Sequence, residues 1–201
     1  MTHAETSMQA ATALALLAFN ALLIAAVVCD LRTRRIPNSL VLAGLALGLM
    51  FQTVAPSGGG LFYGTGASAG SLGPAQALLG AVTGLALFLP MYALRALGAG
   101  DVKLLAMAGV WLGAEPLAWA ALWTLLAGGA LALIVAVGSG VMRQVLSNLH
   151  DMLWCSFLRI QTGQGMSVAA PSRTTGRLPY ALAMACGTTV AVVRQLMRTS
   201  S

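Results

Sequence analysis

The sequence predicts an all-α polytopic membrane protein with about six transmembrane helices. Hydrophobic residues make up 58% of the 201-residue chain and charged residues only 8%, whereas soluble domains carry about 25% charged residues. Most of the apolar runs approach or reach the ~20 residues that a helix needs to cross a hydrocarbon core about 30 Å thick. The bilayer therefore takes the place of a soluble core, and helix packing completes the fold.

Polar or glycine-rich segments separate six apolar runs, and each run is expected to form one span. These runs cover residues 10–29, 39–55, 75–94, 101–112, 117–141 and 179–197. Within the first of them, Asn20 is expected to make an interhelical hydrogen bond. The fourth run is short, because twelve residues give a helix of only about 18 Å. Either this helix begins deep in the membrane, or the turn before it is buried inside the protein, where non-helical backbone is tolerated.

The basic residues predict how the chain is oriented in the membrane. Nine of the eleven Lys and Arg residues fall on one side of the six-span arrangement, and only Arg194 and Arg198 fall on the other. Because loops rich in Lys and Arg favour the cytoplasmic side, the loops at 30–38, 95–101 and 142–178 are predicted to be cytoplasmic and both termini external. The whole of 1–201 is expected to be a single membrane domain, with an amphipathic stretch near 145–160 along the inner surface.

Two of the five acidic residues stand at the ends of apolar runs. Asp30 closes the first run and Asp101 opens the fourth, both on the predicted cytoplasmic side. A carboxylate at membrane depth costs roughly 2.5–3.5 kcal/mol on insertion scales, so it is a candidate functional residue. Two carboxyl groups in contact share a proton, which lets one accept a proton from water while the other donates to a carbonyl oxygen. The two acids therefore predict aspartic-protease chemistry, which needs neither a metal nor a cofactor.

Each acid also has a structural interpretation. An acid just inside a span can pair with a nearby arginine and only fix the topology, as Asp30 could do with Arg34 one helical turn later. Glu115 and Asp151 are expected to be solvated surface residues. The basic residues lie between apolar runs and form no stripe, so the net charge of +6 does not indicate nucleic-acid binding. The three cysteines form no CxxC pair, which predicts unpaired thiols and no metal site.

Three motifs together resemble those of the type IV prepilin peptidases, which are polytopic aspartic proteases of the bacterial inner membrane. Residues 98–104 (Gly-Ala-Gly-Asp-Val-Lys-Leu) resemble the GxGDxK signature, and Asp30 followed by 35–38 (Arg-Ile-Pro-Asn) resembles the region of the first aspartate. Residues 178–183 resemble the start of the last helix. The GxGD pattern alone also marks presenilin-like proteases, but the RxIPN loop at the matching place makes the resemblance specific.

The resemblance implies an enzyme that cuts the short basic leader from a prepilin at the cytoplasmic face, with Asp30 and Asp101 as the catalytic pair. Supporting roles are implied for the remaining motif residues, namely Gly98 and Gly100 in the turn before Asp101, Lys103 as an electrostatic neighbour or a topology lysine, Arg35, Pro37 and Asn38 in the loop, and Pro179 at the last helix. The implied partners are a prepilin or pseudopilin precursor, the lipid bilayer and pilus-assembly proteins. No cofactor, metal or nucleic acid is implied.

The long members of this family carry two CxxC pairs in an added segment, and this sequence has none. It therefore resembles the short branch that serves Flp-type tight-adherence pili, and methyltransferase activity is not carried over. Three other functions are kept open. The acids could be proton carriers in a transporter, or structural groups in a pilus-assembly component. The chain could also be a GxGD protease that cuts within the bilayer.

Overall fold

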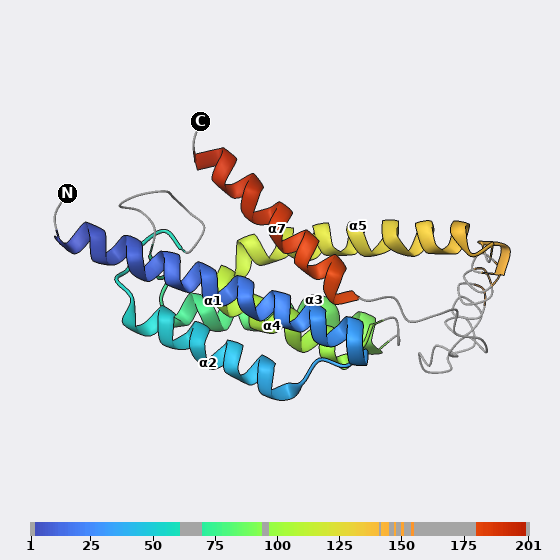
Figure 1. The fold of residues 1–201 in the computed structure, drawn as a ribbon, viewed down its shortest axis with the longest axis horizontal. Helices are drawn as coiled ribbons and strands as arrows, with labels where there is room; N and C mark the ends of the chain where they lie inside the picture. Colours follow the sequence, from blue (N-terminus) through green and yellow to red (C-terminus); the bar gives the residue numbers. More distant parts are fainter. Residues whose placement is uncertain are drawn as a thin grey trace.

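The computed structural model describes residues 3–60, 70–93, 97–140 and 180–199, with a few helical positions between 142 and 154. The described helices are α1 (His3–Thr33), α2 (Asn38–Val54), α3 (Pro74–Ala93), α4 (Ala99–Leu112), α5 (Ala114–Gly138) and α7 (Tyr180–Thr199). Successive helices run in alternating directions, so that both termini lie at the same end of the bundle (Figure 1). The predicted all-α fold is confirmed, and each expected run corresponds to one helix.

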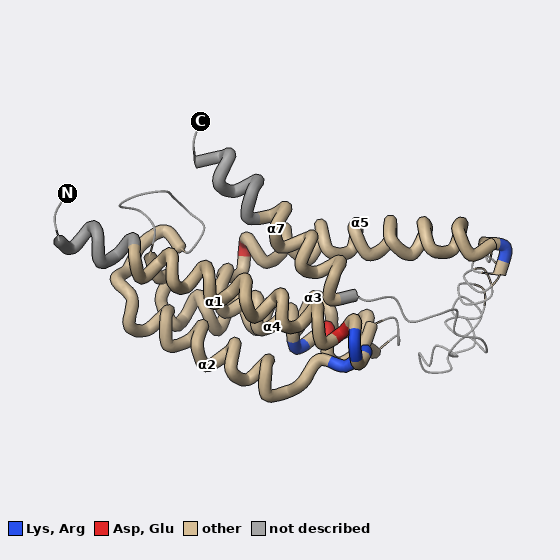
Figure 2. The backbone as a smooth tube through the Cα atoms, in the orientation of Figure 1, with Lys and Arg blue, Asp and Glu red and all other residues tan. Residues whose placement is uncertain are grey.

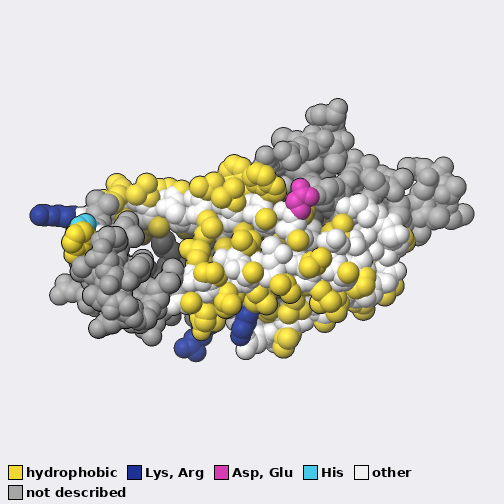
Figure 3. All heavy atoms as spheres, turned by 180° about the vertical axis from the view of Figure 1, so that it is seen from behind, with side chains coloured by type: hydrophobic (Ala, Val, Ile, Leu, Met, Phe, Trp, Pro, Cys, Tyr) yellow, Lys and Arg dark blue, Asp and Glu magenta, His cyan; other side chains and the backbone are white. Residues whose placement is uncertain are grey.

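The outer faces of the helices are apolar, as in a membrane protein. Among the described residues, three helices are long and apolar enough to span a bilayer, namely Ala10–Thr33 within α1, Pro74–Ala93 and Ala114–Gly138. The helix Asn38–Val54 and the part Ala181–Ala191 of α7 are apolar but shorter. Leu14 and Ile134 are among many large apolar side chains left more than half exposed, and Figure 3 shows such side chains spread over one face. Contiguous apolar surface of this kind is suited to lipid.

Helix α4 is short because it lies inside the bundle. Among its fourteen residues, Val102 and the whole stretch 104–112 are buried, and the helix packs against α2, α3 and α5. Gly80 of α3 and Gly109 of α4 meet backbone to backbone, because a Cβ on either would collide with the carbonyl of the other. Small residues permit this close approach between helices in lipid. A helix enclosed in this way does not have to match the bilayer thickness by its own length.

Gln52 stabilises the C-terminal end of α4 through hydrogen bonds, and its side chain is only 1% exposed. Its Nε2 donates to the carbonyl oxygen of Val110 at 3.1 Å, and its Oε1 accepts the N–H of Leu72 at 2.7 Å. The last carbonyls of a helix have no partner within the helix, so Gln52 supplies one to α4. The amide thereby joins α2, α4 and the segment that leads into α3.

Two local expectations are corrected. Asn20 does not reach another helix, since its Nδ2 donates to the carbonyl of Leu16 at 2.8 Å within α1. The segment 113–116, expected to separate the fourth and fifth runs, contains a break of only one residue, because α4 ends at Leu112 and α5 begins at Ala114. Gly113 between them has φ of 80° and ψ of 176°, a conformation that favours glycine. The predicted amphipathic stretch near 145–160 lies almost entirely outside the described residues.

Candidate active site

The first acid, Asp30, lies in the last turns of α1 and is half-buried. The helix ends at Thr33, and Arg34 follows it with φ of 53°, the one non-glycine residue with positive φ among those described. The N–H of Arg34 donates to the carbonyl of Asp30 at 2.9 Å. A left-handed residue directly after a helix ends it and redirects the chain. Arg34 therefore sends residues 35–37 away from the axis of α1 and toward α2.

The carboxylate of Asp30 contacts the start of the last helix. Its Oδ2 accepts the backbone N–H of Ala181 at 3.2 Å, across 151 residues of sequence. The N–H groups of the first turn of a helix have no partner within the helix, so Asp30 satisfies one of them. Sequence reasoning placed Ala181 within the motif at 178–183 but gave it no role at the site, because an alanine in an apolar run carries no chemical signal. The orphan donors expected at any helix start were the chemical indication that a partner is needed here. Pro179, expected beside it, lies outside the described residues.

The second acid, Asp101, lies in the first turn of α4. Its Oδ2 accepts the N–H of Gly98 at 3.1 Å, which is half of a capping box. Gly98 has φ of −80° and ψ of 152°, an extended conformation open to any residue, so the turn does not depend on glycine flexibility. A Cβ at Gly98 would lie 3.2 Å from Oδ2 of Asp101, a crowded distance. The missing side chain thus leaves room for the carboxylate.

The turn before α4 is not buried inside the protein, contrary to one of the two explanations offered for the short fourth run. Gly98 and Ala99 are exposed, and Gly100 and Asp101 are half-buried. Burial begins with Val102. Asp101 therefore lies at the end of the bundle, where the buried part of α4 starts, and it is accessible from that end.

The loop after Asp30 packs on the first turns of α4. Lys103 donates from Nζ to Oδ1 of Asn38 at 3.1 Å. Gly100 faces Ile36, since a Cβ at Gly100 would lie in ordinary contact, 3.4 Å, from Cβ of Ile36. Pro37 precedes α2 with φ of −63° and ψ of 135° and acts as its N-cap. These contacts bring the segment that follows Asp30 against the segment that contains Asp101.

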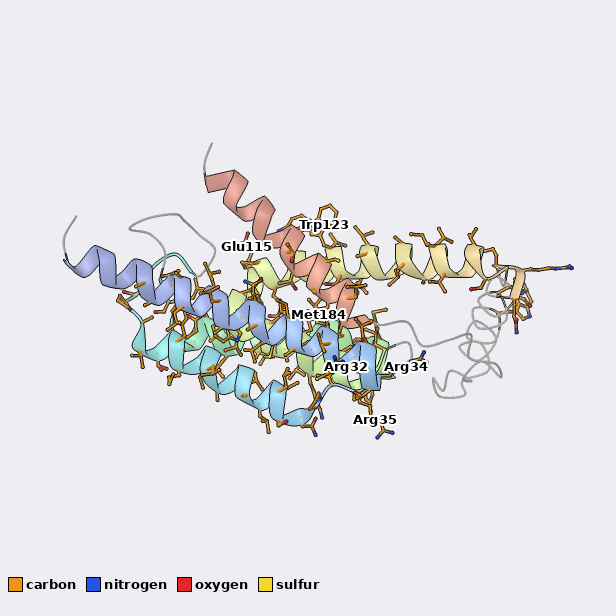
Figure 4. The ribbon with its side chains drawn as sticks, in the orientation of Figure 1. Arg32, Arg34, Arg35, Glu115, Trp123 and Met184 are labelled. Carbon is orange, nitrogen blue, oxygen red and sulfur yellow. The ribbon has the colours of Figure 1, made fainter. Side chains whose placement is uncertain are left out.

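Charged side chains gather at this end of the bundle. Figure 2 shows acidic and basic residues close together where α1 ends and α4 begins. The labelled arginines Arg32, Arg34 and Arg35 project from this end, whereas Glu115 lies well away from them, at the start of α5 (Figure 4). All three arginines are exposed. The bundle therefore has one strongly basic end, and both Asp30 and Asp101 lie there.

The region that contains both acids also carries the family signal. The family model described as the type IV leader peptidase family matches residues 17–136, which is more than half of the chain. The chain belongs to this family. The predicted resemblance to type IV prepilin peptidases is thereby confirmed at the family level, and the protein is a leader-peptidase-like protease. The matched region of this leader peptidase ends within α5 and does not include α7. Neither a curated protein nor a solved structure matches the chain.

The thiols and other metal-binding side chains of the leader peptidase are scattered. Cys29 is half-buried and Cys186 exposed, and both are free thiols. Within the described ranges, no three His, Cys, Asp or Glu side chains form a group that could hold a metal ion.

Proposed function

We propose that this leader peptidase is an aspartic endopeptidase that removes the short basic leader from prepilin-like precursors at the cytoplasmic face of the inner membrane. The observation that carries the proposal is the contact of residues 36–38 with the first turns of α4. This contact joins the segment that follows Asp30 to the segment that contains Asp101. It supports a catalytic pair of acids that come from distant parts of the sequence.

In the proposed reaction the two carboxyl groups share one proton and hold a water molecule between them. The ionised carboxylate removes a proton from the water as the water oxygen attacks the scissile carbonyl carbon. The protonated acid donates its proton to the carbonyl oxygen, giving a tetrahedral diol. When the C–N bond breaks, the carboxyl group that took the proton from water gives it to the leaving amine nitrogen, and one hydroxyl of the diol gives its proton to the other carboxylate as the carbonyl forms again. One water is consumed, and the two acids end with one shared proton, as they began.

The surroundings of Asp30 and Asp101 support a bond cut at the membrane surface. Both side chains are half-buried at the end of the bundle, next to the exposed Arg32, Arg34 and Arg35 that favour the cytoplasmic side. A precursor whose apolar helix lies in the bilayer would present the bond just before that helix at the same level. We assign the precursor to the Flp type. The sequence has none of the CxxC pairs of the long family members, and it therefore resembles the short branch that serves Flp-type pili.

The test is removal of the leader from a co-expressed small Flp-type prepilin, measured as a gel shift. We compare the wild type with Asp30→Asn and Asp101→Asn, since asparagine keeps the shape of the side chain but cannot exchange a proton. Glu115→Gln is the matched control, because Glu115 is an exposed acid at the start of α5, well away from the basic end. We expect both Asp variants to lose at least about 100-fold in rate and the control to cut normally.

Membrane insertion of every variant is checked by fractionation, so that a loss of cutting is not a loss of protein. If either Asp variant removes the leader at the rate of the wild type, that acid is structural and the pair mechanism is overturned. A wild type that leaves prepilins of all types uncut would overturn the substrate assignment.

A further inference from the structure

The last helix meets the candidate site although it lies beyond the matched family region. Its first turn donates the N–H of Ala181 to Oδ2 of Asp30 at 3.2 Å, and Ala181 is only 1% exposed. The family match ends at residue 136. One of the two acids therefore contacts an element outside the matched residues 17–136, at a segment that resembles the start of the last helix in the family.

The position of α7 is fixed by close packing on α5. A Cβ at Gly187 would collide with both the backbone and the side chain of Thr124, so the two helices touch at this point without any intervening side chain. Met184 and Thr188 are completely buried on either side of this contact, at 0% and 1% exposure. The N-terminus of α7 is thus presented to Asp30 by a rigid helix pair.

We infer that α7 completes the active site and that the N–H of Ala181 is a positioning group for Asp30. The hydrogen bond holds Oδ2, which restricts the rotation of the carboxylate and leaves the second oxygen, Oδ1, to contact the catalytic water. A side chain at the end of a helix otherwise samples several rotamers, and a misplacement of about 1 Å in a catalytic group can cost about 100-fold in rate. The inference rests on the proposed function, because it assigns Asp30 to the reaction.

The competing interpretation is that Asp30 only caps α7. Capping predicts lower stability of α7 and an unchanged kcat for each folded molecule. Positioning predicts a lower kcat with an unchanged KM, because the bond orients a reacting group and does not bind the substrate. The two interpretations are separated by removing the N–H alone.

The experiment replaces the amide between residues 180 and 181 with an ester, by incorporating L-lactic acid in place of Ala181. This change removes the N–H and keeps the methyl side chain. The matched control is the corresponding ester at Leu182, which lies in the same first turn and is exposed. Leader removal is measured on purified full-length protein in detergent, giving kcat and KM, with thermal unfolding of each variant as the folding check.

We expect the ester at 181 to lower kcat about 10- to 100-fold with KM within twofold, and the ester at 182 to match the unsubstituted protein. Ala181→Pro, set against Leu182→Pro, repeats the test genetically, since proline is tolerated in the first turn of a helix. A retained kcat for the ester at 181, an equal loss for both esters, or a change in KM alone would each overturn the inference. Failure of the unsubstituted protein to cut would instead overturn the proposed function.

Discussion

Lys103 and Asn38 are joined by a hydrogen bond of 3.1 Å between Nζ and Oδ1, although 65 residues separate them in the sequence. Asn38 is the first residue of α2, and Lys103 lies on α4 two residues after Asp101. The bond therefore sets how the loop after α1 lies on α4. In the proposed enzyme, this contact holds the loop that follows Asp30 against the helix that contains Asp101.

Loss of the Lys103–Asn38 bond is expected to slow cutting. Lys103→Met and Asn38→Ala should each lower kcat by roughly 3- to 10-fold, since a hydrogen bond to a charged group contributes about 1.5–3 kcal/mol and this pair is exposed. The double variant should be no slower than the slower single variant, because both changes remove the same bond. Initial rates of leader removal on purified protein measure all three.

Ser39→Ala is the control for this pair, since Ser39 is the exposed neighbour of Asn38 and should cut normally. Asn38→Asp should retain most of the activity, because a carboxylate can still accept from Lys103. If the losses of the two single variants multiply in the double variant, the two residues act independently and the bond does not position the loop.

Arg34→Gly is expected to stabilise the protein. Arg34 has φ of 53°, and the left-handed conformation costs a residue with a Cβ roughly 1–2 kcal/mol. Glycine avoids that cost but loses more chain entropy on folding, so the net gain should be about 0.5–1 kcal/mol. The midpoint of thermal unfolding in detergent should rise by about 2–4 °C.

The matched change is Arg32→Gly, made inside the last turn of α1. Glycine in a regular helix costs about 1 kcal/mol, so this midpoint should fall. Shifts of the same sign in both variants would mean that the removal of an exposed arginine, and not the backbone conformation, sets the effect.

Gly109→Ala is expected to disrupt packing between α3 and α4. The added methyl would collide with the carbonyl of Gly80, and overpacking of this kind costs about 1–3 kcal/mol. A Cβ added at Gly129 on α5 would meet no atom within 4 Å, so Gly129→Ala should be neutral or slightly stabilising. The yield of monodisperse protein and its unfolding midpoint measure both changes. Equal midpoints for the two variants would contradict the close contact.

Gln52→Met is expected to lower stability by about 2–4 kcal/mol without changing kcat for the folded fraction. Methionine keeps the length of the side chain but leaves the buried carbonyl of Val110 and the N–H of Leu72 without this partner, at about 1–3 kcal/mol for each group. The adjacent Thr53 is exposed, and Thr53→Val serves as the control. Chemical unfolding together with leader-removal rates measures the change. A lower kcat with normal stability would show that Gln52 acts on the site.

The helices and the two acids could be predicted from the sequence because their signals are local. An apolar run of spanning length predicts a helix, and an acid such as Asp101 at its end is conspicuous whatever the rest of the chain does. The position of α4 inside the bundle was not predictable, because its composition does not differ from that of a lipid-facing helix. Its short length was the only indication, and it left two explanations open.

The partners of backbone groups were equally inaccessible to sequence reasoning. Two examples are the hydrogen bond from the N–H of Ala181 to Asp30 and the one from the N–H of Leu72 to Gln52. Each depends on which backbone segment lies next to which side chain, and that arrangement follows from packing. Gln52 was nevertheless a polar residue in an apolar run, a pattern that favours a polar contact within the protein. No comparable signal marks Ala181.

The contact between Asp30 and Ala181 also orders events during synthesis. Asp30 leaves the ribosome 151 residues before Ala181, and at about 5–20 residues per second that interval lasts about 8–30 s. By the end of this interval α1 to α5 and Asp101 have been made, while the hydrogen bond from α7 has not been able to form. A nascent chain therefore acquires this part of the site only after Ala181 has been made.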